Sequence, residues 1–236
     1  MLLGLGVAAS WFAASAEPGE LRPVAPTGDR IVVAPVNLAV RAVKEVEPGI
    51  DPVWRALLDH LSAEQRVIAL ARKEAGVLWN EVMDDEQHAG AGGDLYSAYR
   101  RFAHRVAEQA EFGRIVFPTI VVHSARVRGR SAEWDGVQRL IDVPGRLNDS
   151  IDTFREGKIW INRMGVNGEL AAASLHIAVF SSTGELVHEG TGGLVLLQEL
   201  QPPAKSDEIE LAIVMRRSPF EAPDQLREGI EVAFSE

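Results

Sequence analysis

The densest group of potential metal ligands in this sequence is Asp84, Asp85, Glu86 and His88. Carboxylates together with one imidazole can hold a divalent cation. The spacing matches no metal-binding loop, and side chains that are adjacent in sequence rarely converge on one ion. A solvated acidic helix end is the simpler interpretation, so Asp84, Asp85 and His88 are kept only as candidate metal ligands.

A glycine-rich segment follows directly, with the sequence QHAGAGG at residues 87–93. Gly90, Gly92, Gly93 and Asp94 precede a predicted helix, and a helix N-terminus attracts anions. The segment contains neither the dinucleotide-binding fingerprint nor a Walker lysine, and a helix rather than a strand is predicted before it. These four residues are candidate ligand-binding positions. A flexible connection between two helices is the expected alternative.

The sequence holds six histidines, none of them in an H-E-x-x-H motif. His176 and His188 flank a predicted hairpin turn and could face each other across two strands, where a pair of imidazoles could bind a metal or respond to pH. A plain cross-strand contact is the alternative. Neither Gly-x-Ser-x-Gly nor Ser-x-x-Lys occurs, so no catalytic residue is assigned and no cofactor is expected. A catalytic pair of carboxylates that are distant in sequence and meet only in the folded protein stays possible.

Composition narrows the function classes further. The chain has 236 residues, of which 46% are hydrophobic and 25% charged, as in an ordinary globular protein. A net charge of −10 repels a phosphate backbone, so no nucleic-acid partner is expected. The sequence has no cysteine, which excludes disulfides, thiolate zinc sites, iron–sulfur clusters and a cysteine nucleophile.

The N-terminus resembles an export signal. Residues 2–16 are apolar and uncharged, and the run is shorter than the ~20 residues of a membrane-spanning helix. It ends in Ala14-Ser15-Ala16, with small residues at the two positions that signal peptidase reads. We therefore expect a signal peptide over 1–16, cleavage after Ala16 and a periplasmic or secreted protein. No lysine or arginine precedes the run, so either the true start lies upstream or the segment is instead an N-terminal core helix or a short anchor.

The rest of the chain is predicted to be a linker over 17–29 and one globular domain over 30–236. Proline and glycine interrupt the linker, and no later stretch is apolar enough for an integral membrane span in the mature chain. Early helices alternate with strands: we predict strands at 30–36 and 66–70, and helices beginning at Asp51, at Ala71 and after Asp94, the last one ending at Gly113.

The later part of the domain is predicted to be mostly antiparallel. The hydrophobic segment 114–123 continues into a hairpin, and a second hairpin turns at residues 181–184. A strand is expected within 208–215, and an amphipathic helix over 224–234. The expected fold class is α/β (α+β), with a mixed sheet whose C-terminal half is antiparallel, helices packed on that sheet, and a C-terminal amphipathic helix.

Several of these segments together resemble bacterial envelope proteins of the CsgG-like, PelC-like and TolB N-terminal-like group. The resemblance is at the level of pattern and covers about residues 30–200. The matching positions are Val32 and Val33 with Pro35 in the first strand, Arg72 at the start of a helix, and Gly184, Glu185 and Gly190 in the later hairpin. Two features depart from the pattern: the lipid-bearing cysteine is absent, and Ser181 or Ser182 replaces the usual hairpin aspartate.

The resemblance implies a non-enzymatic periplasmic assembly or accessory protein that acts through an envelope protein partner or through self-association. Two alternatives stay open. One is a small-molecule or glycan-binding module that uses scattered tryptophans and the glycine-rich loop. The other is a hydrolase whose carboxylates, or whose histidine and carboxylate, come together only in the folded protein.

Overall fold

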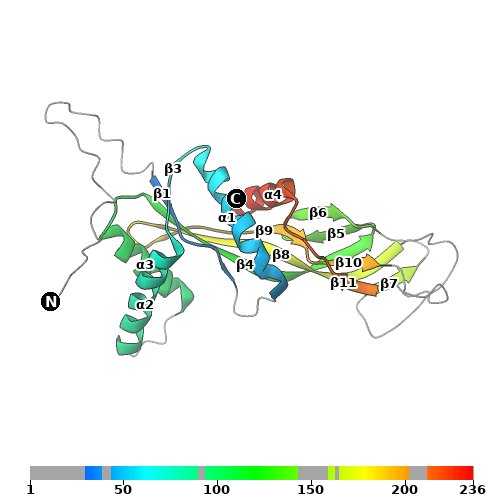
Figure 1. The fold of residues 1–236 in the computed structure, drawn as a ribbon, viewed down its shortest axis with the longest axis horizontal. Coiled ribbons are helices and arrows are strands. Elements are labelled where there is room, and N and C mark those ends of the chain that lie inside the picture. The colour runs from blue at the N-terminus through cyan, green and yellow to red at the C-terminus, as the bar shows by residue number, and fades with distance from the viewer. Residues whose placement is uncertain are drawn as a thin grey trace, which may run out of the picture.

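The computed structural model describes residues 30–38, 44–89, 94–142, 159–162, 165–201 and 212–235, with the backbone alone for 85–89, 159–162 and 165. Nine of its strands form one mixed sheet and two more form a small antiparallel sheet (Figure 1). The predicted signal peptide, the predicted linker and the segment 144–157 lie outside the described residues.

The elements follow one another in an order close to the predicted one. A short 3-10 helix (Lys44–Gly49) precedes the first α-helix. The strands are β1 (Arg30–Val33), β2 (Asn37–Leu38), β3 (Arg66–Ala69), β4 (Arg114–Gly129), β5 (Ser131–Trp134), β6 (Val137–Leu140), β7 (Ile159–Asn162), β8 (Gly165–Ser181), β9 (Leu186–Leu196), β10 (Gln198–Gln201) and β11 (Ala212–Met215). The α-helices are α1 (Ile50–Ser62), α2 (Arg72–Ala89), α3 (Leu95–Ala107) and α4 (Pro223–Phe234).

The long strand β4 organises the sheet. At its N-terminal half it pairs in parallel with β1, which pairs in parallel with β3. On its other side it pairs with β8 in antiparallel register along its whole length, and β8 pairs antiparallel with β9. The hairpin β5–β6 adds to the far end of β4. The predicted mixed sheet with an antiparallel C-terminal half is therefore confirmed.

Helices cover both faces of this sheet. The side chains of a strand alternate between faces, so Val116 and Val179 pack beneath α1 and α4, whereas Ile115 and Phe180 pack beneath α2 and α3. Figure 1 shows α1 crossing the long strands next to α4, and α2 and α3 toward one end. A third apolar core, which includes Trp134, fills the other end, where the β5–β6 hairpin closes over the sheet.

Glycines let α4 lie directly against β9. A Cβ atom at Gly192 would lie 1.9 Å from the carbonyl oxygen of Gly229 in α4, and one at Gly190 would lie 2.1 Å from that of Ala233. In the other direction, a Cβ atom at Gly229 would lie 2.4 Å from the carbonyl oxygen of Gly193. Real side chains do not approach so closely, so helix and strand touch backbone to backbone.

Three predicted boundaries are wrong. Asp51 is not an N-cap, because α1 begins at Ile50 as a continuation of the 3-10 helix, whose Val46 is buried. The helix α3 ends at Ala107 and not at Gly113, whose N–H already donates to Arg30 as part of the sheet at 2.9 Å. Residues 87–89 belong to α2 rather than to a loop.

The turn chemistry of the sequence was predictive. The β5–β6 hairpin turns at Asp135-Gly136, where φ is 38° and 77°. Positive φ at both central residues is the geometry of a type I′ turn, which Asp-Gly favours. The β8–β9 turn carries Gly184 at a φ of 77°. Both predicted hairpins are therefore confirmed, and the predicted C-terminal helix is α4.

Replacing Gly192 with alanine tests the contact between α4 and β9. We expect Gly192→Ala to lower the free energy of unfolding by about 2–3 kcal/mol, because the new methyl group meets backbone atoms that only a shift of the whole helix can relieve. Chemical denaturation measures the change.

Gly76→Ala is the matched control. Gly76 lies in α2, and a Cβ atom there would meet nothing within 4 Å. This variant should be neutral or stabilising by up to about 1 kcal/mol, since alanine is the better helix former. Equal unfolding midpoints for Gly192→Ala and the wild type would contradict the packing described.

Candidate functional site

Polar side chains gather on the sheet face beside α3. The hydroxyl of Tyr96 donates a short hydrogen bond to Glu189. Nε2 of His176 lies 3.7 Å from the same carboxylate, and its Nδ1 lies 3.1 Å from Oγ1 of Thr191. Burial and the hydrogen bond to Glu189 together raise the pKa of Tyr96 to about 12, so this phenol stays protonated at neutral pH.

A second polar cluster lies further along the same face. Oδ2 of Asp135 lies 2.6 Å from Nδ1 of His123 and accepts a hydrogen bond from Oγ of Ser174 at 2.5 Å. The backbone carbonyl of Asp135 also accepts the N–H of Gly193 at 3.0 Å. Through these bonds one turn residue fastens the β5–β6 hairpin to β4, β8 and β9.

The order of the groups in this cluster decides its chemistry. Nucleophilic catalysis by serine needs an imidazole between the hydroxyl and the carboxylate, where it can take the proton. Here the carboxylate of Asp135 lies between Ser174 and His123, and both bond to the same oxygen. Ser174 is also fully buried. The cluster therefore holds the hairpin in place and does not activate a nucleophile.

The predicted pairing of His176 with His188 is wrong. His176 lies opposite Thr191, and His188 lies opposite Val179. Thr191 is three residues beyond His188, and an odd offset puts the two imidazoles on opposite faces of the sheet. His176 lies near Tyr96 on the α3 side, whereas Nε2 of His188 donates to the carbonyl of Ala233 in α4 at 2.9 Å.

Asp94 is the only predicted ligand-binding residue within the described ranges. It caps α3: its carboxylate accepts the N–H of Ser97 at 2.7 Å, and this bond lowers the pKa of Asp94. The prediction that a helix begins after Asp94 is confirmed. The loop glycines Gly90, Gly92 and Gly93 lie outside the described residues, so the ligand-binding role of this segment stays a prediction.

The acidic cluster at the end of α2 is only partly described. Asp84 is exposed on the helix, whereas the side chains of Asp85 and His88 lie outside the described set. Among the side chains that are described, no three histidines or carboxylates are placed to hold a metal ion. The metal site at Asp84, Asp85 and His88 therefore stays a prediction.

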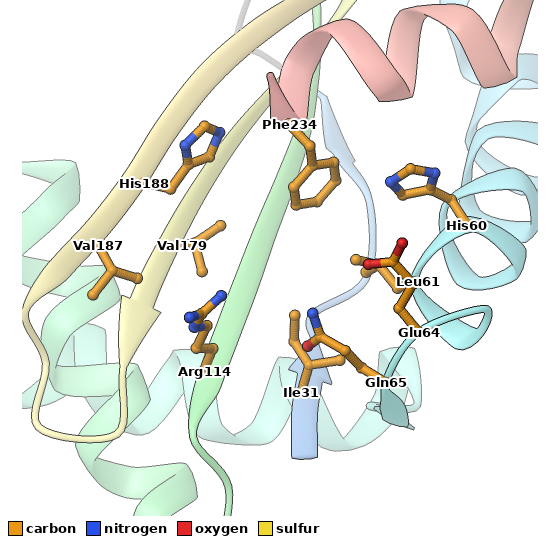
Figure 2. Close-up of a pocket in the computed structure, with 10 residues that line it drawn as sticks. All are labelled: Ile31, His60, Leu61, Glu64, Gln65, Arg114, Val179, Val187, His188 and Phe234. Carbon is orange, nitrogen blue, oxygen red and sulfur yellow. The ribbon is translucent and has the colours of Figure 1, made fainter. Parts of the chain in front are cut away.

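A cleft opens between the end of α4, the end of α1 and the first residues of β1 and β4 (Figure 2). Its volume is about 380 Å³. The ring of Phe234 projects into it and lies between two imidazoles, with its centroid 5.4 Å from that of His60 and 6.0 Å from that of His188. Both rings stack on the phenyl ring, so three elements contribute one aromatic wall.

Charged side chains lie on opposite sides of this cleft. Figure 2 shows Arg114 of β4 on one side and Glu64, just beyond α1, on the other, with Gln65 between them. The residues that line the cleft come from six segments, namely β1, the end of α1, β4, β8, β9 and α4, so no local spacing in the sequence could have revealed them. The one local sign of the cleft in the sequence is that His60 and Glu64 are four residues apart at the end of an amphipathic helix, a spacing that puts two side chains on the same side.

An apolar groove of about 430 Å³ lies on the other face, beyond the carboxyl end of β1. Its wall is a packed set of rings, in which Tyr99 stacks on Phe117 with centroids 4.2 Å apart and Trp79 tilts against Phe102 at 5.8 Å. Arg72 lies at the groove and pairs with exposed Asp51 at 3.6 Å. These rings contact one another and form part of the core.

The tryptophans do not form a glycan platform within the described residues. Trp54, Trp79 and Trp134 each pack against a different one of the three apolar cores. Nε1 of Trp134 donates to the carbonyl of Ala173 at 3.3 Å, as a buried indole must. Scattered tryptophans therefore give no support to a sugar-binding surface here.

A double-mutant cycle tests the role of Asp135. We expect Asp135→Gly, which keeps the positive φ, to lower the free energy of unfolding by about 1–3 kcal/mol because it leaves the buried hydroxyl of Ser174 without a partner. Adding Ser174→Ala should restore part of that loss, since the unsatisfied hydroxyl is then gone. Strictly additive effects in denaturation experiments would contradict the bond.

No protein-family model matches the sequence, and no curated protein matches it. Its function is therefore inferred from its own residues.

Proposed function

We propose that the protein is a non-enzymatic assembly or accessory protein of the cell envelope, and that it acts through contacts with a partner protein or with further copies of itself. The observation that carries this proposal is the uncovered end of β9. Leu186 and Val187 there are 43% and 50% exposed, on a strand that pairs only with β8 among the described strands.

An open strand edge favours protein contacts for a physical reason. Its outer N–H and C=O groups lack strand partners and can pair with another chain, and proteins usually cover such edges or place charges on them. The helix α4 covers the face of β9 at Gly190 and Gly192, and the register shift between β8 and β9 falls at Val187. Leu186 and Val187 lie outside the part of β9 that α4 covers, and their apolar side chains are exposed.

The polar clusters support a role without catalysis. The carboxylate of Asp135 and the imidazoles of His123 and His188 each bond to another element of the fold. Groups that fasten a hairpin or a helix are not available to move protons to and from a substrate. This reasoning favours binding over the hydrolase alternative.

The envelope location in the proposal rests on the sequence of residues 2–16 and its small-residue end. Within the described ranges, no helix has both the length and the apolar character to cross a membrane.

Placing a charge at the end of β9 tests the proposed contact. We expect Leu186→Lys to weaken association about tenfold or more, because a buried unpaired ammonium is strongly unfavourable in an interface. Light scattering on the purified protein measures self-association, and crosslinking in cells detects a partner.

Leu140→Lys is the matched control, since Leu140 is 86% exposed at the end of β6. It should leave association unchanged. A strictly monomeric wild type with no crosslinked partner would contradict the proposal, as would an association that survives Leu186→Lys and is lost in Leu140→Lys.

The export step has its own test. We expect the protein recovered from the periplasm to begin at Glu17, and Ala16→Phe to keep the uncleaved segment because signal peptidase needs a small residue there. Ser15→Phe is the control and should be processed normally. Intact mass spectrometry reads both results, and a wild type that retains residues 1–16 would overturn this part of the proposal.

A further inference from the structure

The cleft of Figure 2 presents opposite charges that do not neutralise each other. Arg114 begins β4 and Glu64 follows α1, and both side chains are exposed. Within the described part of the chain neither side chain makes an ion pair or a hydrogen bond to another residue. Two hydrated charges of opposite sign on facing walls are complementary to a ligand that carries both signs itself.

Apolar side chains line part of the space between these charges, beside the amide of Gln65. Ile31 and Val179, which are 2% and 4% exposed, line the cleft from neighbouring strands. The ring of Phe234 projects from α4 on a third side (Figure 2). A ligand whose charged groups reach Arg114 and Glu64 therefore places its remaining atoms against hydrocarbon.

The aromatic wall is held rigidly. The imidazoles of His60 and His188 stack on either side of Phe234. Nε2 of His188 carries the hydrogen that it donates to the carbonyl of Ala233, which fixes the imidazole relative to the last turn of α4. A wall made of fixed rings loses little conformational entropy when a ligand binds.

From this arrangement we infer that the cleft binds a small zwitterion with an apolar side chain, namely a free amino acid or a short peptide. The carboxylate pairs with the guanidinium of Arg114, whose planar fork suits a carboxylate. The ammonium pairs with Glu64, and the apolar side chain packs against Phe234 and Val179. The cleft volume of about 380 Å³ lies within the range of small-molecule sites, roughly 300–1,000 Å³.

The cleft shares Val187 with the proposed protein contact, but its ligand is a small molecule and it needs no partner chain. Calorimetric titration of the full chain with L-phenylalanine and with L-alanyl-L-phenylalanine tests it. N-acetyl-L-phenylalanine, which lacks the ammonium, and L-phenylalaninamide, which lacks the carboxylate, are the matched probes. We expect at least one zwitterion to bind and both derivatives to bind about tenfold to a hundredfold more weakly.

Variants of the two charged residues locate the site. Arg114→Gln and Glu64→Gln should each weaken binding of the zwitterion about tenfold to a hundredfold. Arg217→Gln and Glu221→Gln, which replace exposed residues outside the cleft, should leave it unchanged.

The derivatives also separate recognition from damage to the fold. In Arg114→Gln, L-phenylalaninamide should bind as well as L-phenylalanine, because the guanidinium that distinguishes a carboxylate from an amide is gone. A variant whose cleft is only distorted would keep the wild-type ratio of the two affinities. No binding of either zwitterion to the wild type overturns the inference. An affinity for the zwitterion that is unchanged in both Arg114→Gln and Glu64→Gln overturns the inference as well.

Discussion

The backbone contact between α4 and β9 fixes most of what is distinctive in this structure. Because Gly190 and Gly192 carry no side chains, the carbonyl oxygens of α4 lie directly against the strand. That depth places Val232 against the turn glycine Gly136 of the β5–β6 hairpin, and it brings Phe234 over the cleft. A side chain on either strand glycine would lift the helix and change the hairpin and the cleft together.

Histidines and carboxylates serve this architecture mainly as fasteners. Asp135 joins its hairpin to three other strands through His123, Ser174 and Gly193. His188 joins β9 to the end of α4. Such bonds satisfy polar groups that the twisted sheet and the short hairpin would otherwise leave without partners, and an unpaired buried polar group costs about 1–3 kcal/mol. The same residue types that suggest catalysis in a sequence thus stabilise the fold in space.

The two proposed binding surfaces lie where the helices leave the sheet uncovered. The helix α4 ends at Phe234, and α1 ends at Ser62. Arg114 at the start of β4 and Leu186 and Val187 at the start of β9 are left exposed. The cleft and the apolar end of β9 lie there together and share Val187. Ligand binding and the protein contact are therefore both proposed at one end of the molecule. The ligand would bind in the charged cleft, and the partner would pair with the open strand edge beside it.

The sequence by itself determined the local elements of this protein. Asp135-Gly136 specified a hairpin, Asp94 specified the start of α3, and the mixed sheet followed from the order of its strands, since these signals depend on residues a few positions apart. Only the tertiary structure decided the strand register, which separated His176 from His188, and the cleft, which joins Glu64 to Arg114 and Phe234. Register and clefts depend on contacts between distant segments, and those contacts leave no periodic signal along the chain.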